Sequence, residues 1–204
     1  QLRARGQKLL VKQQIVSEEN NFFSVRRSVL ARKMSNAEIS EEHLDLILKA
    51  GIRVPDHGAL NPWKIKVIRG NSLKDIDENI ILKEFLKQNP EADKSLIERE
   101  STRLQRASVV IAVLSTPVEH FKIPEWEMRL SSGAVCMNLL SCAQSLNYAA
   151  QWLTEWYAYN DNLLKYLGGN IKNDKIAGFI YIGHKKEEPI ERKRPDPNNI
   201  ITFI

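Results

Sequence analysis

Two short stretches of the sequence concentrate hydrogen-bond donors that could hold one ligand. The first is Arg26 to Ser28, and the second runs from Arg53 to His57 with the sequence RVPDH. An arginine offers a planar fork of donors to a phosphate, and a serine adds a hydroxyl. Three arginines, a hydroxyl and a histidine therefore suit a ligand that carries both a phosphate and a hydrogen-bonding ring. A third stretch, Pro124 to Glu127, fits the same site.

Each of these residues also has a simpler interpretation. An Arg-Arg-Ser tripeptide occurs on solvated surfaces, where charged side chains normally lie. His57 stands in a polar loop, so it is also compatible with an ordinary surface histidine, and Asp56 with an Asx-turn. Trp63 and Trp126 are typical of core or interface aromatics. The pattern alone leaves these alternatives open.

The familiar motifs of other chemistries are missing from the sequence. It contains no GxGxxG, no GxxxxGK[ST], no HExxH and no GxSxG. The four histidines are scattered without metal-ligand spacing, so we predict no metal site. No side-chain nucleophile is indicated either. If the protein is an enzyme, we expect a cofactor to carry the reaction, with no catalytic side chain.

The composition is that of an ordinary globular chain. Its 204 residues are 43% hydrophobic and 27% charged, which is enough for one domain with a sizeable core. The longest apolar run, residues 109–114, is far shorter than the roughly 20 residues that a membrane helix needs. The basic N-terminus leads into no apolar segment typical of a signal peptide. Cys136 and Cys142 lack CxxC spacing, which favours two reduced thiols. We therefore expect a cytoplasmic protein that does not bind membranes.

The formal net charge is +5, and much of the excess lies near the two ends of the chain. A basic surface is compatible with nucleic-acid binding. However, no basic stripe interleaved with aromatics and no zinc finger is present, so a solvated surface is the favoured interpretation. We predict no nucleic-acid partner, and a nucleic-acid binder remains a hypothesis that rests on charge alone.

Hydrophobic spacing predicts more helices than strands. A helix capped by Ser40 should reach residue 52, a second should run from Ser72 to Pro90, and others should cover residues 92–106, 125–146 and 162–167. Strands are expected from Trp63 to Gly70, over residues 107–114, and over 176–182 with Gly183 as the end. Because strands and helices do not alternate regularly, the pattern favours the α+β class.

The order of these motifs resembles the nitroreductase family. Residues 47–63 read ILKAGIRVPDHGALNPW, which is similar to that family's arginine, proline, polar loop and Gln-Pro-Trp pattern, and RVPDH resembles its small RxPDH-type subgroup. Residues 123–133, 151–154 and 176–183 resemble later segments of the same family. The resemblance extends over about residues 22–204, and it is specific as an ordered combination rather than motif by motif.

The resemblance implies a cofactor and a set of contacts. The cofactor is FMN, with NADH or NADPH as the electron donor. The residues implied to bind FMN are Arg26, Arg27, Ser28, Arg53, His57, Trp152, Leu153 and Thr154. The residues implied to lie near the nicotinamide nucleotide are Cys142, Ala143, Gln144, Ser145, Leu146 and Asn147.

The resemblance also implies an architecture and an activity. The expected fold is a single α+β domain over residues 1–204, with a central, mostly antiparallel sheet flanked by helices and two chains intertwined as a homodimer. Residues 1–21 would form an N-terminal helix or arm, and residues 185–204 a tail that docks on the partner subunit. The implied activity is that of an oxidoreductase that passes a hydride from NAD(P)H through FMN to a small acceptor such as a nitroaromatic or a quinone.

Some positions depart from the family pattern. Asn61 stands where much of the family has Gln, and residues 147–150, NYAA, replace the subgroup's glycines before the tryptophan. Trp152, Leu153 and Thr154 stand where the subgroup has a polar WRS-like tripeptide, so the arginine of that tripeptide is lost. The bulk at residues 147–153 supports an alternative, a flavin-binding carrier or sensor with little turnover.

Overall fold

At the centre of the computed structural model, which describes residues 21–204, lies an antiparallel sheet of five strands. The strands are β1 (Met34–Ser35), β2 (Trp63–Arg69), β3 (Val109–Ser115), β4 (Ala149–Leu153) and β5 (Lys175–Lys185). Their order is β1-β5-β3-β2, and β4 pairs with β5. Every strand pair is antiparallel, which confirms the predicted sheet and the α+β class. The arm predicted over residues 1–21 lies, apart from Asn21, outside the described residues.

The central strand β3 separates two hydrophobic cores. All seven of its residues are buried. Because side chains alternate along a strand, Val109, Ile111 and Val113 face one core, and the intervening Val110, Ala112 and Leu114 face the other. The structure thus confirms the strand expected from this apolar run, and both of its faces are buried.

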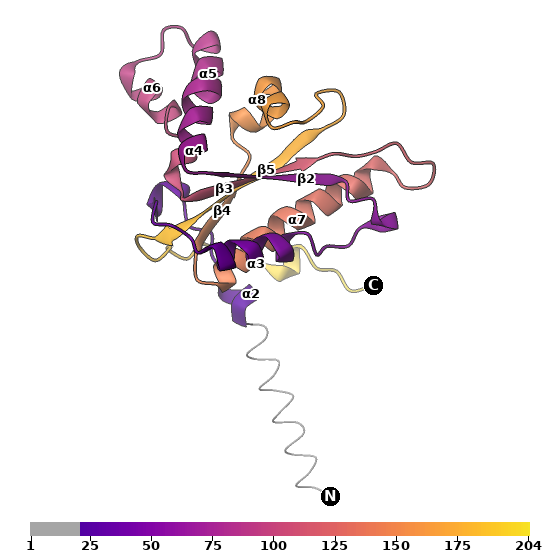
Figure 1. The fold of residues 1–204 in the computed structure, drawn as a ribbon. Coiled ribbons are helices and arrows are strands. Elements are labelled where there is room, and N and C mark those ends of the chain that lie inside the picture. Colours follow the sequence, from indigo (N-terminus) through magenta and orange to yellow (C-terminus); the bar gives the residue numbers. More distant parts are fainter. Residues whose placement is uncertain (1–20) are drawn as a thin grey trace, which may run out of the picture.

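Helices cover both faces of the sheet, as Figure 1 shows. On one face lie α3 (Glu41–Gly51) and the long α7 (Glu125–Ser145), whose apolar residues share a core. On the other face lie α4 (Asn71–Ile76), the short π-helix η3 (Asp77–Ile81), α5 (Leu82–Gln88), α6 (Lys94–Glu100) and α8 (Asp161–Tyr166). The short elements are α2 (Asn21–Val25) and the 3-10 turns η1 (Ala31–Lys33), η2 (His57–Ala59), η4 (Leu104–Arg106), η5 (Trp156–Tyr159) and η6 (Pro197–Asn199).

Several predicted boundaries were wrong. The second helix begins after Gly70, which has φ of 58°, so Ser72 is not its cap. The third helix is confined to α6, because the Asp93 carboxylate accepts a hydrogen bond from Leu96 N and fixes its start. Strand β5 continues past Gly183 to Lys185. A Cβ on Gly183 would lie 2.9 Å from the Ser35 carbonyl oxygen, so this glycine allows β1 to approach rather than ending the strand.

Both cysteines are free thiols, as predicted. Burial raises the pKa of Cys136 to about 12, which keeps that thiol protonated and inert. Within residues 21–204, no helix is long and apolar enough to cross a membrane.

Candidate functional site

The Arg26–Ala31 segment is fastened to β4 and to the end of α7. Gln144 Oε1 accepts a hydrogen bond from Arg26 Nε at 2.8 Å, and Gln144 Nε2 donates to the Arg27 carbonyl at 3.0 Å. Further along, Val29 N donates to the Ala150 carbonyl at 3.2 Å, and Ala31 N donates to Gln151 Oε1 at 2.6 Å. Residues nearly 120 positions apart in the sequence therefore lie side by side.

A cavity of about 430 Å³ lies along this junction. Its lining comes from the first donor stretch, from β4 and from the C-terminal tail, and includes Arg27, Ser28, Lys33, Trp152, Ile190 and Arg192. The structure thus brings together two sets of residues that were implied to bind the same cofactor, Arg26 to Ser28 and the segment that begins at Trp152.

Positive charge is in excess beside this cavity. Arg27 Nε is buried without a hydrogen bond and lies 3.7 Å from a Glu191 carboxylate oxygen. Arg194 pairs with the same carboxylate at 2.9 Å and donates to the Arg26 carbonyl at 3.4 Å. Burial, together with the charges of Arg194 and Arg27, lowers the pKa of Arg26. Arg27 and Arg194 share the single Glu191 carboxylate, and Arg26 lies close enough to both to be affected by their charges, so this cluster favours an additional anion.

The tail residues of this cluster were not predicted from the sequence. The family resemblance assigns residues 185–204 to docking on a partner subunit rather than to the cofactor site. Hydrophobic periodicity carries no information about an irregular segment. Only the charged residues at 191–194 could have indicated that the tail contributes to this cluster.

Trp152 forms one wall of the cavity. Its Nε1 donates to the Ala177 carbonyl at 3.1 Å, and a Cβ on Gly178 would lie only 2.0 Å from that nitrogen. The absence of a side chain at Gly178 therefore lets the indole pack against β5, with 37% of Trp152 still exposed. Leu153 packs against the core, whereas Thr154 is exposed at the end of β4.

The loop that contains Arg53 and His57 is held on α7 instead. Asn138 Nδ2 donates to the Arg53 carbonyl at 2.8 Å, and Ser131 Oγ donates to the Pro55 carbonyl at 2.6 Å. The Asp56 carboxylate accepts from Asn61 N at 2.8 Å, so Asp56 closes the loop. The Arg53 and His57 side chains are both exposed.

His57 lines a second cavity, of about 310 Å³, with Pro55, Glu127, Leu130, Ser131 and Ala134. This cavity shares no lining residue with the one beside Arg27. Within one chain, the residues implied to bind FMN therefore fall into two separate groups.

The segment Cys142 to Asn147 ends α7 and is largely occupied by structural contacts. Ala143 is buried, and Gln144 holds the Arg26–Ala31 segment. Ser145 Oγ donates to the Cys142 carbonyl at 2.8 Å, and Asn147 Oδ1 accepts from Lys185 Nζ at 3.0 Å. Cys142 and Leu146 are half-buried. Only Ser145 and Asn147 expose their side chains in this segment.

One known protein family matches most of the chain. The family model described as "Nitroreductase family" matches residues 24–184. The chain belongs to the nitroreductase family. The narrower RxPDH-type subgroup stays a prediction.

Relatives match the nitroreductase chain over nearly its whole length. It is 28% identical to "Putative NAD(P)H nitroreductase YdjA" of Escherichia coli K12, over 88% of this chain and 95% of that protein. A nitroreductase-like protein from Bacillus cereus has a TM-score of 0.74 at 20% identity, over 90% and 94% of the two chains. A nitroreductase with bound FMN from Bacteroides fragilis has a TM-score of 0.67 at 23% identity, over 90% and 96%. These two structures share the fold of this nitroreductase.

The match to the nitroreductase family covers both donor stretches and the long helix, but it ends before Glu191 and Arg194. Among residues 21–204, no group of three His, Cys, Asp or Glu side chains is arranged to hold a metal ion.

Proposed function

We propose that this protein is an FMN-dependent oxidoreductase that takes electrons from NADH or NADPH and passes them to a small-molecule acceptor such as a nitroaromatic or a quinone. Membership of the nitroreductase family and the relatives named above support the cofactor and the donor. The observation that carries the assignment is the excess of arginine around the cavity beside Trp152.

The residues at this cavity fit the chemistry of FMN. A phosphate would supply the acceptor that the buried Arg27 Nε lacks. Arg26 and Ser28 would add further donors to the same group, and Gln144 holds the Arg26 guanidinium in place. Trp152, Leu153 and Thr154 would border the flavin ring. Bound FMN supplies hydride transfer, which the side chains of this site do not provide on their own.

The protein contributes position and environment rather than acid–base chemistry. The fastened Arg26–Ala31 segment would fix the phosphate donors, and the Trp152 ring packed against β5 would offer an apolar wall that excludes water. Ser145 and Asn147 are the exposed polar side chains of the 142–147 segment that a nicotinamide nucleotide could reach, and each already makes one hydrogen bond within the chain.

We further propose that the complete site forms in a homodimer. The Arg53–His57 loop and the cavity beside Arg27 lie apart in one chain, so a second chain is needed to unite them. A stripe on α7 leaves Trp126 68% and Leu130 55% exposed. The tail tip, residues 200–204, is also exposed and apolar. Large exposed apolar surfaces of this kind mark interfaces.

A second function is favoured by the occupied 142–147 segment. Gln144 is hydrogen-bonded to Arg26 and Arg27, so little of the 142–147 segment remains free for a nicotinamide nucleotide. A flavin-binding carrier or sensor with little turnover would fit this arrangement.

The first test is flavin binding by the purified full chain. We expect a yellow protein that retains one FMN per chain through dialysis and that binds riboflavin, which lacks the phosphate, far more weakly. A colourless chain with no measurable FMN affinity would refute both functions. Retained flavin that NADH and NADPH fail to bleach would select the carrier or sensor.

A further inference from the structure

Among the described residues, the His57 side chain forms a hydrogen bond with Glu127. Its Nδ1 lies 2.6 Å from Glu127 Oε2, while Nε2 has no hydrogen-bond partner among the described residues. Both side chains are about half exposed, so the pair is accessible to a ligand. The ring lines the cavity with Leu130 and Ala134 of the α7 stripe.

The backbone that carries His57 is held in one conformation. Gly58 has φ of 74°, and Ala59 and Asn61 also have positive φ. A Cβ on Gly58 would lie 2.6 Å from Ile123 Cδ1, so only glycine fits there. With Asp56 closing the loop and Ser131 fastening Pro55, little freedom remains for His57 except rotation of its own side chain.

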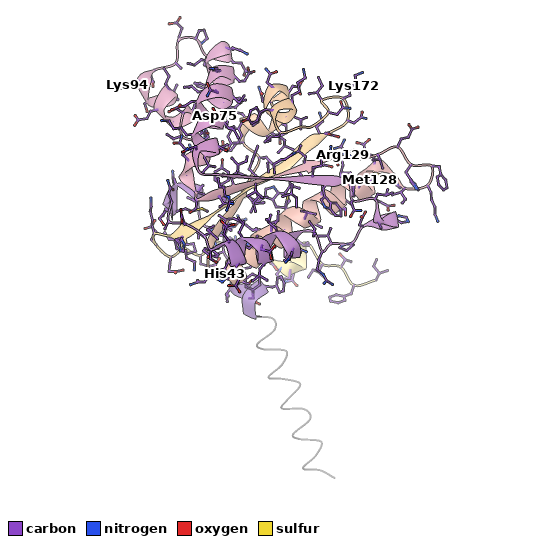
Figure 2. The ribbon with its side chains drawn as sticks, viewed as in Figure 1. His43, Asp75, Lys94, Met128, Arg129 and Lys172 are labelled. Carbon is purple, nitrogen blue, oxygen red and sulfur yellow. The ribbon has the colours of Figure 1, made fainter. Side chains whose placement is uncertain are left out.

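The Glu127 carboxylate is available to His57 because Arg129, on the same helix α7, pairs with Glu125 instead. Arg129, labelled in Figure 2, donates from Nε to Glu125 Oε1 at 2.5 Å and from Nη2 to the Asn173 carbonyl at 3.0 Å. Among the described residues, the Glu127 carboxylate makes no other hydrogen bond or ion pair. Two glutamates in the first turns of the same helix thus have different partners.

We propose that Glu127 is a positioning residue that sets which ring nitrogen of His57 faces the flavin; this inference rests on the proposed function. A carboxylate accepts but does not donate, so Nδ1 must carry the hydrogen. The neutral ring then offers Nε2 as an acceptor, and the protonated ring offers it as a second donor. The carboxylate also fixes the plane of the ring, as in other carboxylate–histidine pairs.

The tautomer can be measured directly by ¹⁵N-edited NMR of the full chain, before and after loading with FMN. We expect the hydrogen of neutral His57 on Nδ1 in the wild type. Glu127→Ala should move it to Nε2, the preference of a free imidazole. Glu127→Gln, whose amide oxygen still accepts from Nδ1, should retain it. Glu125→Gln is the matched control and should change nothing. Hydrogen on Nε2 in the wild type, or no change in Glu127→Ala, would overturn the proposal.

FMN affinity supplies a second readout. His57→Ala and Glu127→Ala should each weaken FMN binding by about fivefold to tenfold, the effect of one hydrogen bond. The double variant should be no weaker than His57→Ala, because both changes remove one interaction. Fully additive losses would overturn the positioning role. If the chain binds no FMN at all, the proposed function fails, and the tautomer measurement still decides whether Glu127 orients His57.

Discussion

Among individual residues, Arg27 gives the strongest structural support for a phosphate-bearing cofactor. Its buried Nε has no hydrogen bond, and its nearest carboxylate is 3.7 Å away. Residue types and order were sufficient to predict Arg26, Arg27 and Ser28 as phosphate donors. The roles of Gln144 and Arg194 depend on contacts across more than 100 residues, which no local pattern reveals.

The first prediction concerns Arg27→Ala. Removing a charged partner of a phosphate should weaken FMN binding by roughly tenfold to a hundredfold, the equivalent of about 1.5–3 kcal/mol. Arg32→Ala is a matched control, because Arg32 is exposed and does not line the cavity. Quenching of FMN fluorescence measures both affinities. Equal affinities of the two variants would contradict the role of Arg27.

The second prediction is that removing the charge of Glu191 strengthens FMN binding, whereas Arg27→Ala weakens it. Glu191 places a negative charge beside Arg27 and Arg194, where the phosphate is expected, so like charges would repel. Glu191→Gln should therefore tighten FMN binding, by about twofold to fivefold because the carboxylate is exposed and screened. Glu188→Gln, which removes a carboxylate paired with Lys185, is the control. Weaker binding in Glu191→Gln would mean that the glutamate orients the arginines instead.

At the scale of elements, a buried ion pair joins α6 to the turn that follows β4. The Glu100 side chain is 1% exposed and pairs with Arg103 at 2.5 Å, while Arg103 also reaches Glu155 at 3.3 Å. Trp156 Nε1 donates to the same Glu100 carboxylate at 2.9 Å. Glu155 directly follows Thr154, so this cluster holds the end of the segment expected to border the flavin.

Acid should break this cluster, which is the third prediction. Burial raises the pKa of Glu100, but hydrogen bonds from Arg103 and Trp156 and the charge of Arg103 outweigh it, so the net pKa is lowered from 4.5. Because the folded pKa is the lower one, the stabilisation is complete above about pH 4.5 and is lost as the pH falls through the folded value.

Glu100→Gln should accordingly cost about 3 kcal/mol at neutral pH, since it leaves a buried arginine short of a partner. Glu98→Gln, exposed on the same helix, is the control. Urea unfolding at several pH values measures both. The difference between wild type and Glu100→Gln should shrink below pH 4.5. A constant difference down to acid pH would exclude the pair as the cause.

The elements also show where sequence patterns suffice and where they fail. Strand β3 and helix α7 were predicted because long apolar runs and helical spacing are strong signals. β1 and β4 were missed: β1 has only two residues, and β4 carries the small Ala149 and Ala150 with no alternation of polar side chains. The end of β5 was predicted at Gly183, which was wrong. The glycine is needed there because β1 packs close to it, and that contact depends on tertiary structure.

The whole molecule is expected to function as a dimer, because the FMN contacts lie in two places on one chain. Ile200, Ile201 and Phe203 are between 56% and 96% exposed, which suits docking on a partner better than contact with water. We expect an interface of more than roughly 2,000 Å² in total, the size typical of obligate dimers.

Deleting residues 200–204 tests this fourth prediction. Sedimentation of the full chain at micromolar concentration should give twice the monomer mass. The deletion should weaken the dimer and release FMN together, since the same interface completes the cofactor site. A flavin-loaded monomer, in either form, would contradict the shared site.

Anaerobic titration of the FMN-loaded protein with NADH or NADPH tests most directly whether it is an NAD(P)H-dependent oxidoreductase. We expect one equivalent of at least one donor per flavin to bleach the visible flavin absorbance, and a nitroaromatic or a quinone added afterwards to restore it. A flavin that stays oxidised with both donors, in a protein that retains FMN, would contradict the assignment as an NAD(P)H-dependent oxidoreductase.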